Sequence, residues 1–364
     1  MAGIYIHIPF CRSKCIYCDF YSRPQISRFE SLVDGLIEEF QARRNEIAEP
    51  YTTIYIGGGT PSILPIDQLS KLVTKVTMDL VQEFTIEANP DDVTREKVLA
   101  WKDLGVNRVS LGVQTFNDKV LRQIGRRHDS HQAVEAIHLL NENGIGNISA
   151  DLIYGLPGID QEMWEADLKT MLSLPISHMS AYCLTFNEGT MLYKLLQKGK
   201  VREMSDDDAI LRFEALRRLT AEAGFEHYEI SNFAKPGYRS KHNSSYWNPR
   251  HTWLGIGPSA HSFDGRVRRI DYPNLDLWLK KLPRPYEIDE ETQLDRINDI
   301  IVTSLRTVEG LDIGEIPEHY REGLLRDASE YIDKGFMTLN GNYLSIPPQH
   351  WLMSDCYIRD LIII

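Results

Sequence analysis

The chain has 364 residues, of which 42% are hydrophobic and 25% charged, and this globular composition is long enough for roughly two or three domains. Its 52 acidic and 40 basic residues leave a net charge of -12, which repels phosphate backbones and argues against a nucleic-acid partner. No apolar run approaches the roughly 20 residues of a membrane-spanning helix, and the first residues lack a secretory signal pattern, so we expect a cytoplasmic protein.

The first half of the sequence alternates strand patterns with helix patterns. Short runs of β-branched and aromatic residues predict strands at 3–8, 53–56, 83–87, 108–113, 148–153 and 178–184. Longer amphipathic stretches predict helices at 27–48, 67–79, 94–104, 131–143 and 161–172. Serial β/α units indicate a parallel sheet with helical crossovers. The pattern alone leaves open whether this sheet is doubly wound or forms a complete or partial barrel.

Beyond residue 200 the pattern changes. A charged helix is predicted at 206–223, followed by an irregular stretch at 231–263 that is rich in aromatic residues, Pro, Gly, Asn and His and too apolar for a disordered linker. The chain then becomes helical again, and MTLNGNYLSI predicts a hairpin. We therefore expect a connecting region at 205–289 and a winged-helix-like domain at 290–364, without the basic recognition helix of a DNA reader.

Three cysteines give the first functional signal. Cys11, Cys15 and Cys18 lie within eight residues, whereas the other two cysteines are far away. This clustering is not a disulfide framework, and a C-x3-C-x2-C loop after the first strand can hold one inorganic centre at the strand's carboxyl end. A [4Fe-4S] cluster on three cysteines keeps one iron open for a small chelating molecule. The alternatives are a zinc site completed by His7 or a remote residue, and cysteines that bind no metal.

The segment around these cysteines, HIPFCRSKCIYCDF, resembles the cluster loop of the radical S-adenosylmethionine (SAM) superfamily. Gly-Gly-Gly-Thr-Pro at 57–61 matches the superfamily's second element, in which glycines let the backbone approach a polar ligand, although alone it is also typical of a plain βα turn. The resemblance implies a partial (β/α)6 TIM-like barrel over residues 1–204 with a smaller carboxy-terminal domain of helices and a hairpin. It also implies a [4Fe-4S] cluster on Cys11, Cys15 and Cys18 whose open iron binds S-adenosyl-L-methionine.

Within the superfamily the resemblance points to the branch of oxygen-independent coproporphyrinogen III oxidase and its relatives, and it covers nearly the whole chain. Carried over position by position, it implies that SAM contacts Tyr5, Tyr17, Gly58, Gly59, Thr60, Glu87, Gln114, Arg126 and Asp151. For Glu87, Gln114 and Asp151 the residue types agree, because polar side chains at the carboxyl ends of parallel strands point into the mouth of the sheet. The alternative role of these three residues is a helix cap or a loop hydrogen bond. Arg126 lies next to Arg127, and either of the two arginines could face solvent.

Two departures separate the chain from the oxidase. The oxidase carries a further cysteine two positions after the third ligand, where this chain has Phe20. It also has an amino-terminal extension ahead of the cluster loop, whereas this sequence starts shortly before the loop. Both features match the related HemW-type haem chaperone group, which is not thought to decarboxylate porphyrinogens. We therefore expect a haem chaperone, with the oxidase as the alternative, and the question of enzymatic activity stays open.

The HNxxYW signature of that group is present as HNSSYW at 242–247. The resemblance implies that His242 holds haem, and imidazole is a common axial ligand of haem iron. The tyrosine and tryptophans nearby offer flat apolar surface for a porphyrin face, and His251 and His261 are further candidate ligands. The alternatives are a buried histidine that is hydrogen-bonded to a carbonyl, and aromatic residues that belong to an ordinary core.

The same resemblance predicts the partners. Arg239, Lys241 and Arg250 flank the motif and would pair with haem propionates, unless they are solvated surface residues. The predicted partners are haem and haem-accepting apo-proteins, and peripheral membrane association and a homodimer are left open. The final segment, WLMSDCYIRDLIII, is too short to span a membrane and is expected to dock on the protein. Cys183 and Cys356 are expected to be buried packing residues.

Overall fold

The structure, a computed structural model, describes residues 2–24, 26–280 and 283–364. Its centre is a run of parallel strands that pair in chain order, each with the next. These strands are β1 (Ala2–Ile8), β2 (Tyr51–Gly58), β3 (Glu83–Ala88), β4 (Arg108–Gln114), β5 (Asn147–Tyr154) and β6 (His178–Cys183). The strands predicted from the sequence are confirmed, each to within about two residues at either end.

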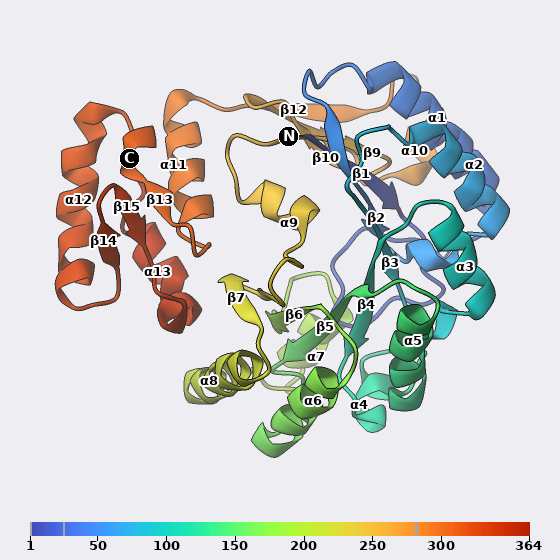
Figure 1. Ribbon diagram of the computed structural model, residues 1–364, viewed down its shortest axis with the longest axis horizontal. Helices are drawn as coiled ribbons and strands as arrows, with labels where there is room; N and C mark the ends of the chain where they lie inside the picture. The colour runs from blue at the N-terminus through green and yellow to red at the C-terminus, as the bar shows by residue number, and fades with distance from the viewer. Residues whose placement is uncertain (1, 25, 281–282) are drawn as a thin grey trace.

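Helices cover the outer face of the curved sheet and connect these strands (Figure 1). They are α1 (Phe29–Arg43), α2 (Ile66–Val76), α3 (Arg95–Asp103), α4 (Asp118–Gln123), α5 (Ser130–Glu142) and α6 (Gln161–Ser173). The predicted helices are confirmed, and α4 escapes prediction because six residues are too few to show a helical period. A capping box fixes the start of α5, where Asp129 and Gln132 each accept the other's backbone N–H.

The residues of each parallel strand alternate between two environments. On β4, Val109, Leu111 and Val113 are fully buried and belong to the hydrophobic core between sheet and helices. Ser110 and Gln114 lie on the opposite, concave face, where they line a pocket. The apolar positions of β4 therefore pack against the helices. Its polar positions lie on the concave face, where they are available to a ligand.

The stretch at 231–263 is not irregular, and this corrects the prediction of an irregular connecting region. It and its flanks form β7 (Glu226–Glu229), β8 (Asn232–Ala234), β9 (Thr252–Ile256), β10 (His261–Phe263), β11 (Val267–Asp271) and β12 (Tyr286–Glu290). The complete order is β12-β11-β10-β9-β1-β2-β3-β4-β5-β6-β8-β7, in which β9 joins β1 in parallel and β8 joins β6 in antiparallel pairing. Because β12 and β7 remain edges of the sheet, the barrel is partial, as predicted.

Four helices accompany the added strands. They are α7 (Met191–Gln197), α8 (Asp206–Glu222), α9 (Lys241–Tyr246) and α10 (Leu275–Lys280). Helix α9 carries most of the HNxxYW motif and lies on the concave side of the sheet, in contact with β1 and β2 (Figure 1). The motif is therefore part of the barrel interior rather than of an outer surface.

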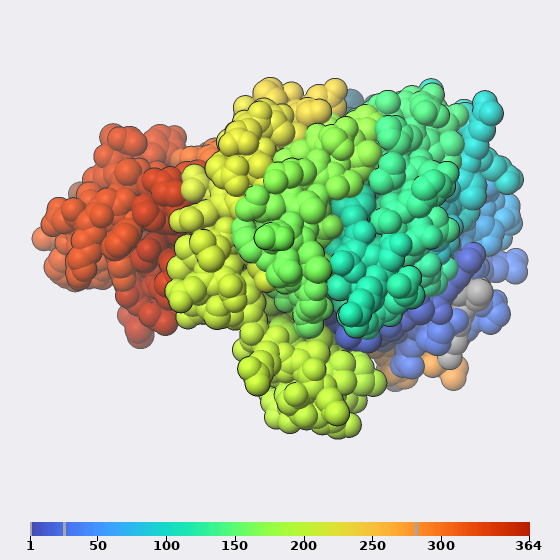
Figure 2. Space-filling model, turned by 90° about the horizontal axis from the view of Figure 1, so that it is seen from below, coloured from blue at the N-terminus to red at the C-terminus, as the bar shows by residue number. Residues whose placement is uncertain are grey.

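The carboxy-terminal part combines helices with a small sheet, as predicted. Its elements are α11 (Gln293–Ser304), β13 (Leu311–Asp312), α12 (Glu318–Asp333), β14 (Thr338–Asn340), β15 (Tyr343–Ser345) and α13 (Ser354–Arg359). The predicted hairpin is β14–β15, and Gly341 turns it with a φ of 60°. Figure 2 shows these elements, in red, at one end of the molecule. The exact division into three domains stays a prediction. Within the described ranges, no helix has the length and apolar character needed to cross a membrane.

Candidate functional site

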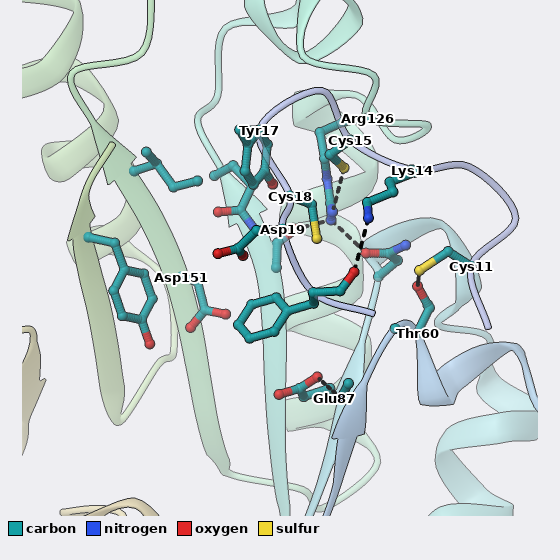
Figure 3. A pocket seen from close by; sticks show the side chains of 18 of the residues that line it. Cys11, Lys14, Cys15, Tyr17, Cys18, Asp19, Thr60, Glu87, Arg126 and Asp151 are labelled. Atoms are coloured by element: carbon teal, nitrogen blue, oxygen red, sulfur yellow. Dashed lines mark hydrogen bonds between the residues drawn. The ribbon is translucent and has the colours of Figure 1, made fainter. Parts of the chain in front are cut away.

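A pocket of about 550 Å³ opens at the carboxyl ends of the parallel strands, where the cysteine loop meets the sheet (Figure 3). The predicted site residues that line it are Cys11, Cys15, Cys18, Tyr17, Gly58, Gly59, Thr60, Glu87, Gln114, Arg126 and Asp151. Residues that the sequence analysis missed include Tyr55, Asn89, Ser110, Ser180, Tyr182, Cys183 and Asn243. Strand alternation could have identified Ser110, which shares a strand face with Gln114, whereas Asn243 depends on how α9 packs.

The cysteine loop is held by backbone hydrogen bonds along its length. Cys11 N–H donates to the carbonyl of Arg23 (3.1 Å), and Ile16 N–H donates to the carbonyl of Ile124 (3.1 Å). The Thr60 hydroxyl donates to Cys11 Sγ at 3.3 Å. Burial raises the pKa of the Cys11 thiol and raises that of Cys18 to about 11. The thiols are therefore partly buried and lie at one wall of the pocket.

The donor set fits a cluster better than a single ion. No three His, Cys, Asp or Glu side chains of the described residues are arranged to hold one metal ion. A cubane distributes its ligands over separate irons and so needs sulfur atoms farther apart than one zinc ion does. His7 does not complete a zinc site, because its Nδ1 hydrogen-bonds the Tyr5 hydroxyl (3.0 Å) and its Nε2 the carbonyl of Tyr21 (3.1 Å). Three thiols facing one pocket fit a [4Fe-4S] cluster with an open corner.

The Gly-rich segment after β2 packs against the end of β1. A Cβ on Gly58, whose φ is 108°, would lie 2.6 Å from the His7 ring, and a Cβ on Gly59 would lie 2.6 Å from the carbonyl oxygen of Phe10. Gly59 N–H donates to the carbonyl of Ile8 at 2.8 Å. These glycines therefore let the segment approach the cysteine loop, and they place its backbone at the pocket wall.

Two carboxyl groups face the pocket, Glu87 from β3 and Asp151 from β5, with β4 between the two strands (Figure 3). Glu87 accepts from the Tyr55 hydroxyl (2.8 Å) and from Gly58 N–H (3.0 Å), and burial raises its pKa to about 7. Burial also raises the pKa of Asp151 to about 6, and its Oδ1 has no partner among the described residues. Neither residue caps a helix. A buried acceptor that is left open at the pocket wall fits a ligand with hydroxyl or ammonium groups, as SAM has.

The irregular end of β4 places the side-chain amide of Gln114 at the same pocket wall as the two carboxyl groups. Gln114 has a φ of 74°, which a residue with a side chain rarely adopts, and the pairing of β4 with β5 shifts register between Gly112 and Gln114. Backbone strain of this kind typically marks a functional position. Gln114 is 9% exposed and lines the pocket.

Of the two adjacent arginines, Arg126 is the one directed at the cysteines. Its guanidinium donates to the Asn89 side chain (2.6 Å), to the carbonyl of Gly112 and, at 3.7 Å, to Cys15 Sγ. Arg127 instead pairs with Asp91 at 2.8 Å and with the adjacent aspartate. The guanidinium of Arg126, the predicted site residue, therefore lies beside the predicted cluster ligands, and its contact with SAM stays a prediction.

Two predicted site residues lie outside the pocket. Tyr5 is partly buried behind it, where its ring packs against Tyr55. The prediction that His242 ligates haem does not fit this structure, because its side chain is 0% exposed. Its Nδ1 is 2.8 Å from the Thr53 hydroxyl and its Nε2 is 2.9 Å from the Tyr246 hydroxyl. Both ring nitrogens are used, so no lone pair is open to an iron.

The cations flanking the motif are also engaged. Arg239 pairs with Glu309 at 2.8 Å, Arg250 pairs with Glu315, and the Lys241 ammonium donates to a glutamine side chain at 2.9 Å. These three cations are surface residues with protein partners, which agrees with the alternative that they are surface residues rather than partners of haem propionates. The prediction that Cys183 is buried is wrong, since it is exposed at the end of β6 and lines the pocket, while Cys356 is only partly buried.

Comparisons with known proteins give sequence relatives over most of the chain. The family model for the radical SAM superfamily matches residues 5–171. The chain is 36% identical to the heme chaperone HemW of Lactococcus lactis, over 87% of this chain and 84% of that protein. It is also 36% identical to the heme chaperone HemW of Bacillus subtilis, over 89% and 88% of the two chains.

A solved structure matches nearly the whole fold. Coproporphyrinogen III oxidase (HemN) from Escherichia coli, a radical SAM enzyme, superimposes with a TM-score of 0.85 and covers 99% of this chain and 90% of its own. Its sequence is 20% identical, so this likeness concerns the fold alone. Together with the sequence relationship over most of both chains, these findings show that the protein belongs to the HemW family of the radical SAM superfamily.

Proposed function

We propose that the protein is a haem chaperone, which binds haem and passes it to haem-dependent proteins while it carries a [4Fe-4S] cluster and SAM. The observation that carries this proposal is the 36% identity to HemW over 87% of the chain. The pocket supports the cofactor part, because it collects three thiols, a Gly-rich backbone segment and two carboxyl groups at one sheet edge. The setting we propose is the cytoplasm, with haem-accepting apo-proteins as partners.

The residues of the pocket would divide the cofactors between them. Cys11, Cys15 and Cys18 would hold the cluster, whose open iron supplies one-electron chemistry on SAM when both are bound. Donors to sulfur stabilise the charged thiolates, and the Arg126 guanidinium and a threonine hydroxyl lie within reach of two of them. On the opposite wall, Glu87, with Asp151 and Gln114, would orient the hydroxyl and ammonium groups of SAM.

The haem part of the proposal does not use the His242 imidazole, since both of its nitrogens are occupied. Two other histidines of the same region are His261, which is exposed, and His251, which is partly exposed. If an imidazole holds the haem iron, we propose one of these two. Changing each to alanine and recording the haem absorption spectrum distinguishes them.

An oxygen-independent coproporphyrinogen III oxidase is the alternative function. At the position of the oxidase's further cysteine this chain has Phe20, whose side chain is 64% exposed beside the predicted cluster ligands. An exposed phenyl ring offers no metal ligand there. This observation favours the chaperone over the oxidase.

One set of experiments tests the proposal. Anaerobically reconstituted protein is expected to contain four irons per chain, to bind haem, and to restore activity to an apo haem enzyme. The Cys15→Ser variant is the matched control, and it should lose the cluster while it still binds haem. Protein that neither binds nor transfers haem, or that converts coproporphyrinogen III to protoporphyrinogen IX, would contradict the chaperone function.

A further inference from the structure

We propose that His242 is a positioning residue of the SAM pocket, which acts through Tyr55 to hold the Glu87 carboxylate in place. In this view the HNxxYW helix, α9, closes the concave side of the barrel and supports the pocket from behind. The inference rests on the proposed SAM site. It assigns to the motif a role other than haem ligation.

The first step is the attachment of α9 to the sheet. Glu83, at the start of β3, accepts the backbone N–H of Lys241 (2.9 Å) and of His242 (2.8 Å). A carboxylate at these otherwise unpaired groups satisfies the helix start and complements its dipole. The Ser240 hydroxyl adds a cap by accepting from Asn243 N–H at 3.2 Å. These bonds fix α9 to the barrel interior at its amino-terminal end.

The second step is the set of contacts that fixes the His242 imidazole in one orientation. Its nitrogens lie 2.8 Å from the Thr53 hydroxyl on β2 and 2.9 Å from the Tyr246 hydroxyl one turn along α9. On β1, a Cβ on Gly3 would lie 2.9 Å from the imidazole Cε1, so only a glycine leaves room for the ring. Burial and the Arg108 charge lower the pKa of His242 to about 3, and the ring is therefore neutral.

The third step leads from the imidazole to the pocket. The Tyr55 ring stacks on His242, with centroids 5.1 Å apart and an interplanar angle of 25°. The Tyr55 hydroxyl donates to Glu87 Oε1 at 2.8 Å, and Glu87 Oε2 accepts from Gly58 N–H at 3.0 Å. Imidazole, phenol, carboxylate and Gly-rich segment thus form one connected series, of which the last three line the pocket.

Close packing makes this series rigid. A Cβ on Gly57 would lie 2.8 Å from Tyr55 Cε1 and 3.0 Å from Glu87 Oε1. The Tyr55 phenol therefore has no free space on the side of Gly57. Loss of the His242 ring, on which the phenol stacks, opens space on its other side. A tyrosine that tilts toward such a cavity withdraws its hydroxyl from Glu87. The carboxylate then loses one of the two donors that orient it.

The test compares SAM affinity in anaerobically reconstituted variants. His242→Ala is expected to weaken SAM binding about tenfold, and Tyr55→Phe by a similar factor, since each releases Glu87. His227→Ala is the matched control: its imidazole stacks on Phe233 with centroids 4.0 Å apart, but Phe233 does not line the pocket. This control should change SAM affinity less than about twofold even where it lowers the melting temperature.

A double variant separates positioning from general destabilisation. When Tyr55 is already phenylalanine, adding His242→Ala should weaken SAM binding by less than about twofold, because the route through the hydroxyl is gone. Full additivity of the two changes would overturn the proposal. The conservative His242→Gln change, which keeps hydrogen-bonding groups in place, should recover part of the lost affinity.

A second measurement does not depend on SAM. Amide hydrogen exchange of residues 51–60 should accelerate in His242→Ala and not in His227→Ala, because the Gly58 N–H loses a well-placed acceptor. Unchanged exchange and unchanged affinity would together refute the inference. Wild-type protein that binds no SAM would count against the proposed function, while the exchange result would still decide the role of His242. Loss of haem in His242→Phe, with SAM affinity intact, would also overturn it in favour of a ligand role.

Discussion

At the scale of single residues, Glu87 couples the pocket to pH. Burial raises its pKa from the usual 4.5 to about 7, so the folded chain binds more protons than the unfolded chain between these values. The Glu87 contribution to stability therefore falls as the pH rises through this window, by up to about 3 kcal/mol, whereas the buried histidines with lowered pKa contribute in the opposite direction. Glu87→Gln should remove this contribution, so that the free energy of unfolding of the variant gains on that of wild type as the pH rises. Urea unfolding at pH 5, 6 and 7 measures it.

Asp151 provides the internal control for this prediction. Its pKa is raised in the same direction, from the usual 3.8 to about 6, so its contribution ends at a lower pH than that of Glu87. Asp151→Asn should likewise gain on wild type below about pH 6 and show no further gain between pH 6 and 7. A constant difference in stability between Glu87→Gln and wild type from pH 5 to 7 would mean that Glu87 is ionised in the folded protein.

Gln114 combines backbone strain with a place in the pocket that we propose binds SAM. At its φ of 74° an alanine is unfavourable and a glycine is not. Gln114→Gly is therefore expected to be more stable than Gln114→Ala by about 1 kcal/mol, the reverse of the usual order in a strand. Both should bind SAM more weakly than wild type, because both lose the amide. Equal stability of the two variants would show that β4 relaxes at this position.

At the scale of elements, the sequence patterns that span many residues were the ones that predicted structure. Helix α2, with 11 residues, has a clear amphipathic pattern, while β8 and β10 have three residues each and show no period. Such strands form because a partner edge is available: β8 beside β6, and β10 beside β9. That information lies in the tertiary structure.

The same distinction holds within the site. The cysteines, the Gly-rich segment and Glu87 were predictable, because short motifs at strand ends place them. The role of His242 was not, since it depends on Gly3, Thr53 and Glu83, which approach it only in the folded barrel. A histidine in this motif predicted an iron ligand, whereas in the folded protein both ring nitrogens of His242 are hydrogen-bonded to hydroxyl groups.

A buried ionic group joins α1 to the strands beyond β1. Arg43 donates to Glu39 (2.9 Å), to the Ser262 hydroxyl (2.8 Å) and to Asp271 (3.4 Å). Burial raises the pKa of Asp271 to about 7. Arg43→Met leaves Arg269 as the remaining cation, 3.0 Å from Asp271 and 3.6 Å from Glu39, and should cost about 3 kcal/mol at pH 8. The cost should be smaller at pH 6, where Asp271 takes up a proton.

Urea unfolding at the two pH values measures this cost. The matched control is Arg359→Met, whose partner Asp360 lies 3.3 Å away at the surface. Such an exposed pair contributes about 0–1 kcal/mol. If both variants lose the same small amount, the buried group does not hold the added strands on the barrel.

At the scale of the whole molecule, the carboxy-terminal part is bonded to the edge of the large sheet. Ile230 N–H donates to the carbonyl of Arg306 (3.1 Å), and Val308 N–H donates to the carbonyl of Tyr228 (3.1 Å). The Trp351 ring packs edge-on against His227, with centroids 4.5 Å apart. Backbone bonds and a buried tryptophan connect the two parts, so we expect them to resist unfolding together.

The chain end docks on α11 within the carboxy-terminal part, and this docking bears on membrane association. Ile363 exchanges two hydrogen bonds with the Asn298 side chain on α11, each 2.9 Å long, and Leu361 is 2% exposed. Of the four final apolar residues only Ile364 is fully exposed. One such side chain contributes about 2 kcal/mol to lipid binding, too little for stable attachment.

We therefore expect that deletion of Ile364 leaves the partitioning of the protein between buffer and phospholipid vesicles unchanged. Asn298→Ala releases the backbone groups of Ile363 and should lower the free energy of unfolding by about 1 kcal/mol. Because this change also frees the apolar end, vesicle binding should increase in Asn298→Ala and return to the wild-type level when 361–364 are deleted as well. Sedimentation with vesicles measures both effects. Wild-type binding that disappears on deletion of Ile364 would show that the end inserts into lipid rather than docking on α11.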